Sequence, residues 1–77
     1  MIRGLAARLS YSIAYFQQDG EAIADALDVA RVHGILDYQR GNHHEPELFI
    51  GTPLIEHWRK GRQLAEHYLL LSSELAA

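Results

Sequence analysis

Cysteine is absent from this chain of 77 residues. Without it the protein has no disulfide, no thiolate nucleophile and no sulfur ligand for zinc or for an iron–sulfur cluster. Because a fold without disulfides does not need an oxidising compartment, we expect a cytoplasmic protein.

Long apolar runs are missing as well. The run near the end of the chain, Tyr68-Leu69-Leu70-Leu71, is far shorter than the roughly 20 residues that a helix needs to cross a bilayer. Near the start, Arg8 and Ser10 interrupt the stretch that would have to serve as the apolar part of a signal peptide. We therefore expect neither a membrane-spanning segment nor a targeting segment.

Positive charge is in the minority. Ten acidic side chains against seven lysines and arginines give a net charge of −3, so the average field of the molecule repels phosphate backbones. The acids crowd between residues 19 and 28, whereas the basic cluster consists of Arg59, Lys60 and Arg62. This balance disfavours nucleic acid as a partner.

Catalytic motifs are not found. The chain holds no glycine-rich phosphate loop, dinucleotide fingerprint, nucleophile elbow or His-Glu-x-x-His helix. Its serines have no neighbouring sequence that would build an oxyanion hole or supply a base. We therefore expect that the protein is not an enzyme and that it needs no cofactor.

Histidine, in contrast, occurs five times. His33 and Asp37 lie four residues apart, so on a helix both could reach one ion, and His43 and His44 adjoin Glu45. The alternative is that these are surface or helix-terminal histidines, because no recognised ligand spacing is present. We favour the alternative and expect no metal site.

Apolar residues with helical spacing dominate what is present. Seventy-seven residues predict one domain, 1–77, with a thin core, because a chain of this size leaves roughly 40% of its extended-chain surface exposed. The first predicted helix ends before Asp19-Gly20. Its apolar residues recur at three- and four-residue steps and form one stripe, which consists of Ile2, Leu5, Leu9, Ile13 and Phe16.

The second predicted helix begins near Glu21 and ends near Arg40, where Gly41 can cap it in the left-handed conformation. Its inner face contains small residues at four-residue steps, which let another backbone approach closely. The predicted face comprises Ile23, Ala26, Leu27, Ala30 and Gly34.

Residues 42–51 form a predicted loop, because Pro46 cannot continue a helix. Its apolar residues, Leu48, Phe49 and Ile50, should fold down over the helices. Thr52 and Pro53 then signal the start of a third helix that runs to about Ser73.

The third helix carries two apolar stripes, which predicts burial on two sides. The seam consists of Leu54, Trp58, Gly61, Ala65, Tyr68 and Ser72, and the second stripe of Leu64, Leu71 and Leu75. The resulting fold class is all-α: a small three-helix domain in which a loop with proline and glycine joins the last two helices into a hairpin, with the first helix packed across it.

The segment from Trp58 to Arg62 is the best candidate for contact with a partner. Arg59, Lys60 and Arg62 can bind phosphate or carboxylate, and Trp58 can supply a stacking face or an interface anchor. The alternative is that Trp58 belongs to the core and leaves three solvated basic residues around it. The sequence does not decide between core and interface.

The residues Gly34, Gly41, Pro46, Trp58 and Gly61 have a spacing that resembles the ribosome modulation factor family, over about residues 34–65. In that family a glycine pair precedes a proline-containing linker and a helix with Trp-x-x-Gly. The resemblance implies a two-helix unit and binding to ribosomal RNA near the messenger channel, which silences the ribosome in stationary phase.

The chain also departs from this family in charge and in two positions. The family is basic and this chain is acidic, Glu47 replaces an aromatic residue after the loop proline, and Arg62 replaces a second tryptophan. We therefore expect a non-enzymatic protein-binding regulator or inhibitor, of the kind carried by mobile elements, that acts through a helical face. The alternative is a ribosome-associated modulation factor.

Self-association is a further expectation. Each predicted helix carries an apolar stripe, and 77 residues provide too little mass to cover all of them. A homodimer would bury paired stripes.

Overall fold

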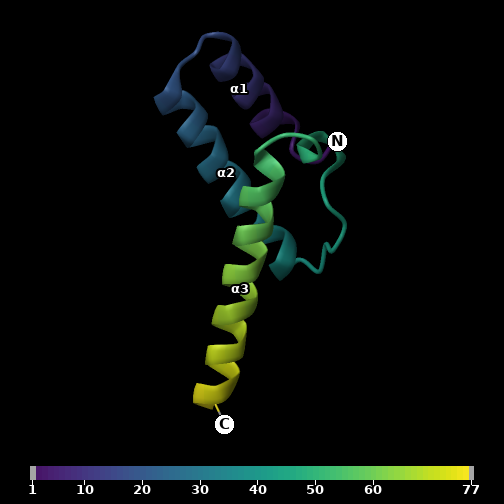
Figure 1. Cartoon of the computed structure of the whole chain (residues 1–77). Helices are drawn as coiled ribbons and strands as arrows, with labels where there is room; N and C mark the ends of the chain where they lie inside the picture. Colours follow the sequence, from purple (N-terminus) through teal and green to yellow (C-terminus); the bar gives the residue numbers. More distant parts are fainter. Residues whose placement is uncertain (1, 77) are drawn as a thin grey trace.

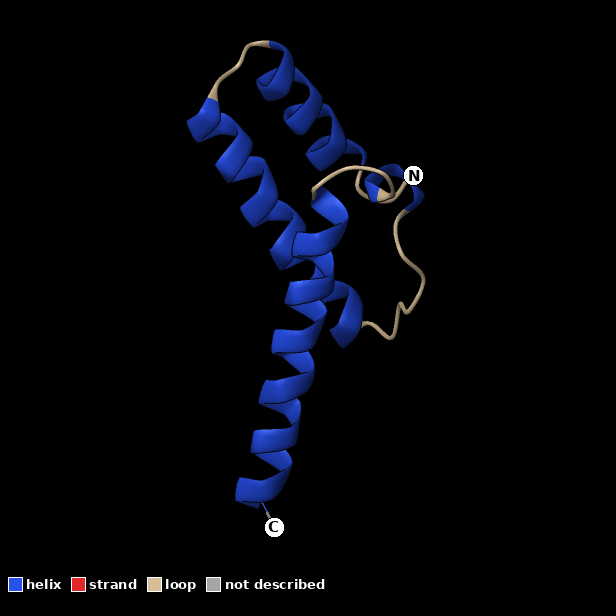
Figure 2. Cartoon of the chain, in the orientation of Figure 1, coloured by secondary structure: helices blue, strands red, loops and turns tan. Residues whose placement is uncertain are grey.

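The computed structural model describes residues 2–76, with side chains as far as Leu69. Three α-helices make up most of it: α1 (Leu5–Phe16), α2 (Gly20–Gln39) and α3 (Leu54–Ala76), with a short 3₁₀ helix η1 (Glu47–Phe49) between α2 and α3. The described residues contain no strand (Figure 2). The predicted all-α class with three helices is confirmed.

Local signals account for the helix boundaries. The Asp19 carboxylate accepts a hydrogen bond from the Ala22 amide at the start of α2, and Gly41, with φ +76°, follows its end in the left-handed conformation. The Thr52 hydroxyl accepts from the Leu54 amide, 3.2 Å away. These are the stop and start residues that the sequence indicates.

The helices pack in two different ways. Figure 1 shows α1 and α2 side by side and antiparallel, joined by a tight turn, so these two helices form the hairpin. The loop after α2 carries the chain back along that helix, and α3 then crosses α2 while running in the same general direction. The proline- and glycine-containing loop is therefore present, but the pair that it joins is a crossed pair and not an antiparallel one.

Two glycines meet where α2 and α3 cross. A Cβ atom on Gly34 would overlap the carbonyl oxygen of Trp58, and a Cβ atom on Gly61 would overlap the carbonyl oxygen of Arg31. Because these obstacles are helix backbone, the two axes can come this close only where side chains are missing. The predicted close approach at Gly34 thus has a second glycine as its counterpart.

The core lies around this crossing. Its largest fully buried side chains include Trp58, Phe49 and Leu54, and Ala26 and Ala30 of α2 pack against them. Within the predicted loop, η1 carries Phe49 into the core and half-buries Leu48, whereas Ile50 stays exposed.

The apolar stripe of α1 is present but faces solvent. The buried residues of α1 are Ala7 and Ala14, and Tyr11 is partly buried against the core. Small side chains face inward where α1 packs against α2 and η1, and the large residues of the stripe occupy the opposite side of the helix.

The predicted burial of α3 on two sides is wrong beyond the point where α3 crosses α2. Leu54, Trp58 and Gly61 of the predicted seam are buried, but Leu64, Tyr68 and Leu69 are exposed, and Ala65 is half-buried. The physical reason is length, since α3 continues past the end of α2 (Figure 1). The side chains of Ser72, Leu71 and Leu75 lie outside the described residues.

Candidate functional site

A buried carboxylate of α2 lies against Trp58 of the predicted binding segment. Asp37 of α2 is 2% exposed, and its Oδ2 atom accepts hydrogen bonds from Trp58 Nε1, Arg3 Nη2 and His33 Nδ1, each at 2.8 Å. The donors come from α3, from the segment before α1 and from α2 itself. This one side chain therefore ties three parts of the fold together.

Charge and hydrogen bonding set the ionisation of Asp37. Burial raises the pKa of this carboxyl, but the hydrogen bonds from Trp58 and Arg3 and the proximity of His33 outweigh it and hold the pKa below its usual value. The carboxylate is thus the form that the folded protein favours at neutral pH.

The lowered pKa of Asp37 predicts a loss of stability in acid. A depressed folded pKa contributes stability that is complete above the unfolded pKa of about 3.9 and is lost as the pH falls through the folded value. We expect urea unfolding to show a free-energy difference between the wild type and Asp37→Asn that is present at neutral pH and shrinks below about pH 4. A difference that does not change between pH 7 and pH 2 would contradict this assignment.

Trp58 belongs to the core. Its ring is 2% exposed, and its only polar atom is used by Asp37. The sequence leaves open whether Trp58 belongs to the core or to an interface, and in the structure it belongs to the core. A partner therefore cannot use the ring as an anchor unless the fold opens.

Arg62 covers the buried tryptophan from outside. Its guanidinium carbon lies 5.1 Å from the centre of the Trp58 ring and 5.6 Å from that of Tyr38. It also donates to the carbonyl oxygen of Asn42, 2.6 Å away, and its Nη2 atom lies 2.9 Å from His43 Nδ1. The expectation that this basic side chain is fully solvated is wrong for Arg62, because its guanidinium contacts a loop carbonyl and two aromatic rings.

Arg59 forms ion pairs on the surface. Its Nε atom lies 2.6 Å from Glu45 Oε2 and its Nη1 atom 2.9 Å from Glu56 Oε1. The hydrogen bond with Arg59 lowers the pKa of Glu45. Lys60 is exposed beside it. The predicted basic cluster is therefore present as neighbours on α3, but two carboxylates balance much of its charge. Its role in partner binding stays a prediction.

The histidines do not assemble a ligand set. His33 and Asp37 do meet, as their spacing on a helix predicts, but the same oxygen atom already accepts from Trp58 and Arg3. Among residues 2–69, whose side chains are described, no group of three or more histidine, aspartate or glutamate side chains is arranged to hold an ion. Within this same part of the chain, no helix has the length and apolarity to cross a membrane.

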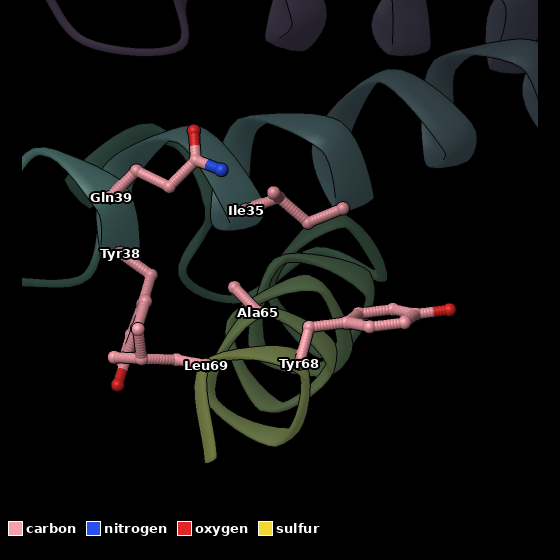
Figure 3. A pocket seen from close by; sticks show the side chains of 6 residues that line it. All are labelled: Ile35, Tyr38, Gln39, Ala65, Tyr68 and Leu69. Atoms are coloured by element: carbon pink, nitrogen blue, oxygen red, sulfur yellow. The ribbon is translucent and has the colours of Figure 1, made fainter. Parts of the chain in front are cut away.

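A groove opens where α3 leaves α2. Its volume is about 520 Å³, and Figure 3 shows Ile35 and Ala65 between the two helices, with Tyr68 projecting outward from α3. Among the residues whose side chains are described, none that lines it is charged: α2 contributes Ile35, Tyr38 and Gln39, and α3 contributes Ala65, Tyr68 and Leu69.

Sequence reasoning missed Asp37 as a structural centre and missed Arg3 altogether. One signal was available for Asp37, because it continues the spacing of Ala26, Ala30 and Gly34 on the small-residue face of α2. An acid on a buried face requires a donor, and the single tryptophan offers one. No local signal marks Arg3, whose partner lies 34 residues away.

Comparison of the chain with protein-family models, with curated proteins and with solved structures finds no match.

Proposed function

We propose that the chain is a non-enzymatic protein-binding regulator or inhibitor of the cytoplasm that takes up an amphipathic helix of a protein partner in the groove between α2 and α3. The observation that carries this proposal is the exposure of apolar side chains on α3 where the helix continues past α2. Beyond the crossing, Tyr68 is 66% exposed and Leu69 54% exposed, although both lie beside an apolar hollow.

The shape and chemistry of the groove support a helical partner. An amphipathic helix presents apolar anchors at three- and four-residue steps, and it binds where a groove offers an apolar floor between two helices. Ile35 and Ala65 supply such a floor, and the hydroxyl of Tyr38 and the amide of Gln39 supply polar groups at its edge. Because the described side chains that line it are uncharged, the groove favours an apolar stripe over a phosphate or a charged peptide.

The alternative is a ribosome-associated modulation factor that binds ribosomal RNA. Its support is that Gly34, Trp58 and Gly61, which carry the resemblance to that family, gather at one helix crossing. Packing explains these three residues without RNA, however, and the carboxylates of Glu45 and Glu56 offset the charge of Arg59. We therefore rank protein binding first.

Leu69→Glu should weaken partner binding without unfolding the protein. The side chain is exposed, so stability should change by no more than about 0.5 kcal/mol, whereas a carboxylate at the groove should weaken an apolar contact at least tenfold. The measurement is capture of a discrete protein from the native host on the tagged chain, followed by titration of that protein. Glu66→Gln, on the same helix but outside the groove lining, should bind like the wild type.

A second variant separates protein binding from RNA binding. Arg59→Gln with Lys60→Gln removes the two exposed charges and leaves Arg62, which is packed on Trp58. Binding in the groove should be retained. If the captured partner is RNA, its affinity should instead fall for every sequence, and the slope of log affinity against log salt should flatten by about two units. That result would replace the protein-binding proposal by the ribosomal one.

A further inference from the structure

The outer face of α1, defined by Leu5, Leu9, Ile13 and Phe16, is the most exposed apolar surface of one helix in the described chain. These side chains are 41%, 53%, 56% and 89% exposed, respectively. They follow one another at steps of four, four and three residues, so they form a single stripe along the helix. The stripe lies opposite the buried alanines Ala7 and Ala14.

The remaining contacts of α1 hold it weakly. It has 12 residues, its N-cap Gly4 provides no side-chain hydrogen bond, and it has no acidic residue in its first turn and no basic residue in its last. A helix of this length is marginal unless packing stabilises it. Its inner face buries mainly alanine side chains, which contribute little apolar area. The four side chains of the outer stripe would add to the stability of the helix if another molecule covered them.

We propose that a second copy of this chain covers the outer face of α1, so that two α1 helices pair in an antiparallel homodimer. A two-fold interface brings each residue close to its own counterpart or to a residue of the same face, and such a face must therefore be self-complementary. The four stripe residues carry no charge and meet this condition. With the axis near Leu9, Leu5 of one copy faces Ile13 of the other.

The area of the two stripes fits a weak dimer. Complete covering of both stripes would bury at most on the order of 1,000 Å², which just reaches the lower bound for a specific interface. Association in the micromolar range is the corresponding expectation.

Charge favours a second copy over a lipid surface. Arg3 and Arg8 are the only charged residues before Asp19. Arg3 is paired with Asp37, and Arg8 donates to Ser12 and lies over the Tyr11 ring. Arg3 is thereby neutralised, whereas Arg8 keeps its charge, and one uncompensated arginine falls far short of the clusters of roughly four to eight basic residues that bind anionic lipids. The exposed acids Asp19 and Glu21, which follow Phe16 closely, would be repelled by such a surface.

Sedimentation velocity of the purified chain tests the proposal. From about 1 to several hundred micromolar, the wild type should pass from monomer to dimer. Leu9→Glu combined with Ile13→Glu should raise the dissociation constant about 100-fold or more, because paired carboxylates would be buried without partners. Leu69→Glu is a matched control on α3 and should dimerise like the wild type.

A single cysteine gives an independent measure, since the chain has none of its own. In Leu9→Cys, diamide should oxidise two thiols across the two-fold axis to a disulfide, with loss of both protons and with reduction of the diamide. The product is a covalent dimer. Gln63→Cys, at an exposed position of α3, should stay largely uncrosslinked under the same conditions.

Three results would overturn the homodimer. They are a wild type that remains monomeric at several hundred micromolar, a dimer that persists in the Leu9→Glu, Ile13→Glu double variant, and a monomer that cosediments with phosphatidylcholine vesicles through the α1 stripe. None of these affects the groove between α2 and α3. Capture of a partner that depends on Leu69 would stand even if the chain proved monomeric.

Discussion

Gly61→Ala should unfold the protein or destabilise it by about 3 kcal/mol or more. The new methyl group would overlap the carbonyl oxygen of Arg31 and press on the amide of Ile35, and both are backbone atoms of a helix that cannot give way alone. The gain in helix propensity from glycine to alanine, about 1 kcal/mol, is too small to offset this. For a domain of this size the loss is a large share of the total stability. Thermal and urea unfolding followed by circular dichroism measure it.

Gly20→Ala is the matched control for this substitution. Gly20 begins α2, and nothing lies within 4 Å of a Cβ atom placed on it. The same change of residue should therefore be neutral or should stabilise by up to about 1 kcal/mol through the unfolded state. If Gly61→Ala and Gly20→Ala had similar stabilities, the close crossing of α2 and α3 would be wrong.

Asp37→Ala should destabilise the protein by about 3–5 kcal/mol. The substitution leaves Trp58 Nε1 without an acceptor in the core and leaves the guanidinium of Arg3, whose Nε atom is already buried without a partner, with no counter-charge. A buried ion that loses its partner is more costly than an exposed one. The free energy of unfolding at pH 7 is the measurement.

The control for Asp37→Ala is Asp28→Ala on the same helix. Asp28 is exposed, and its ion pair with Arg31 spans 3.8 Å, so its loss should change stability by less than about 1 kcal/mol. Trp58→Phe serves as a partial variant, because it removes one donor to the carboxylate and keeps most of the ring. The destabilisation by Trp58→Phe should lie between those by Asp28→Ala and Asp37→Ala. A larger effect than that of Asp37→Ala would contradict the central role of the carboxylate.

Local chemistry explains how far the fold could be predicted. Asp19, Gly41 and Thr52 act on amides and carbonyls within a few residues of themselves, so their roles are visible in the sequence. The face on which a helix is buried depends instead on the neighbour that covers it. On α1 the conspicuous stripe around Leu9 remains outside, and the less conspicuous Ala7 and Ala14 are buried.

The same distinction applies to the candidate site. The basic residues Arg59, Lys60 and Arg62 could be found as a cluster because they are adjacent in sequence. Their partners could not, since Glu45 is 14 residues from Arg59 and the carbonyl of Asn42 is 20 residues from Arg62. Whether a charge is free or paired follows from such distant contacts, and periodicity carries no information about them.

The sequence by itself determined three helices, the caps at the end of α2 and the start of α3, and a proline-containing loop, because hydrogen bonds and backbone preferences of neighbouring residues decide these features. Only the tertiary structure decided that Gly34 and Gly61 bring α2 and α3 into backbone contact, with Trp58 placed on the buried Asp37. It also decided that the apolar face of α1 is left uncovered. The physical reason is that close packing and desolvation act between segments far apart in the chain, and their outcome depends on which surfaces meet.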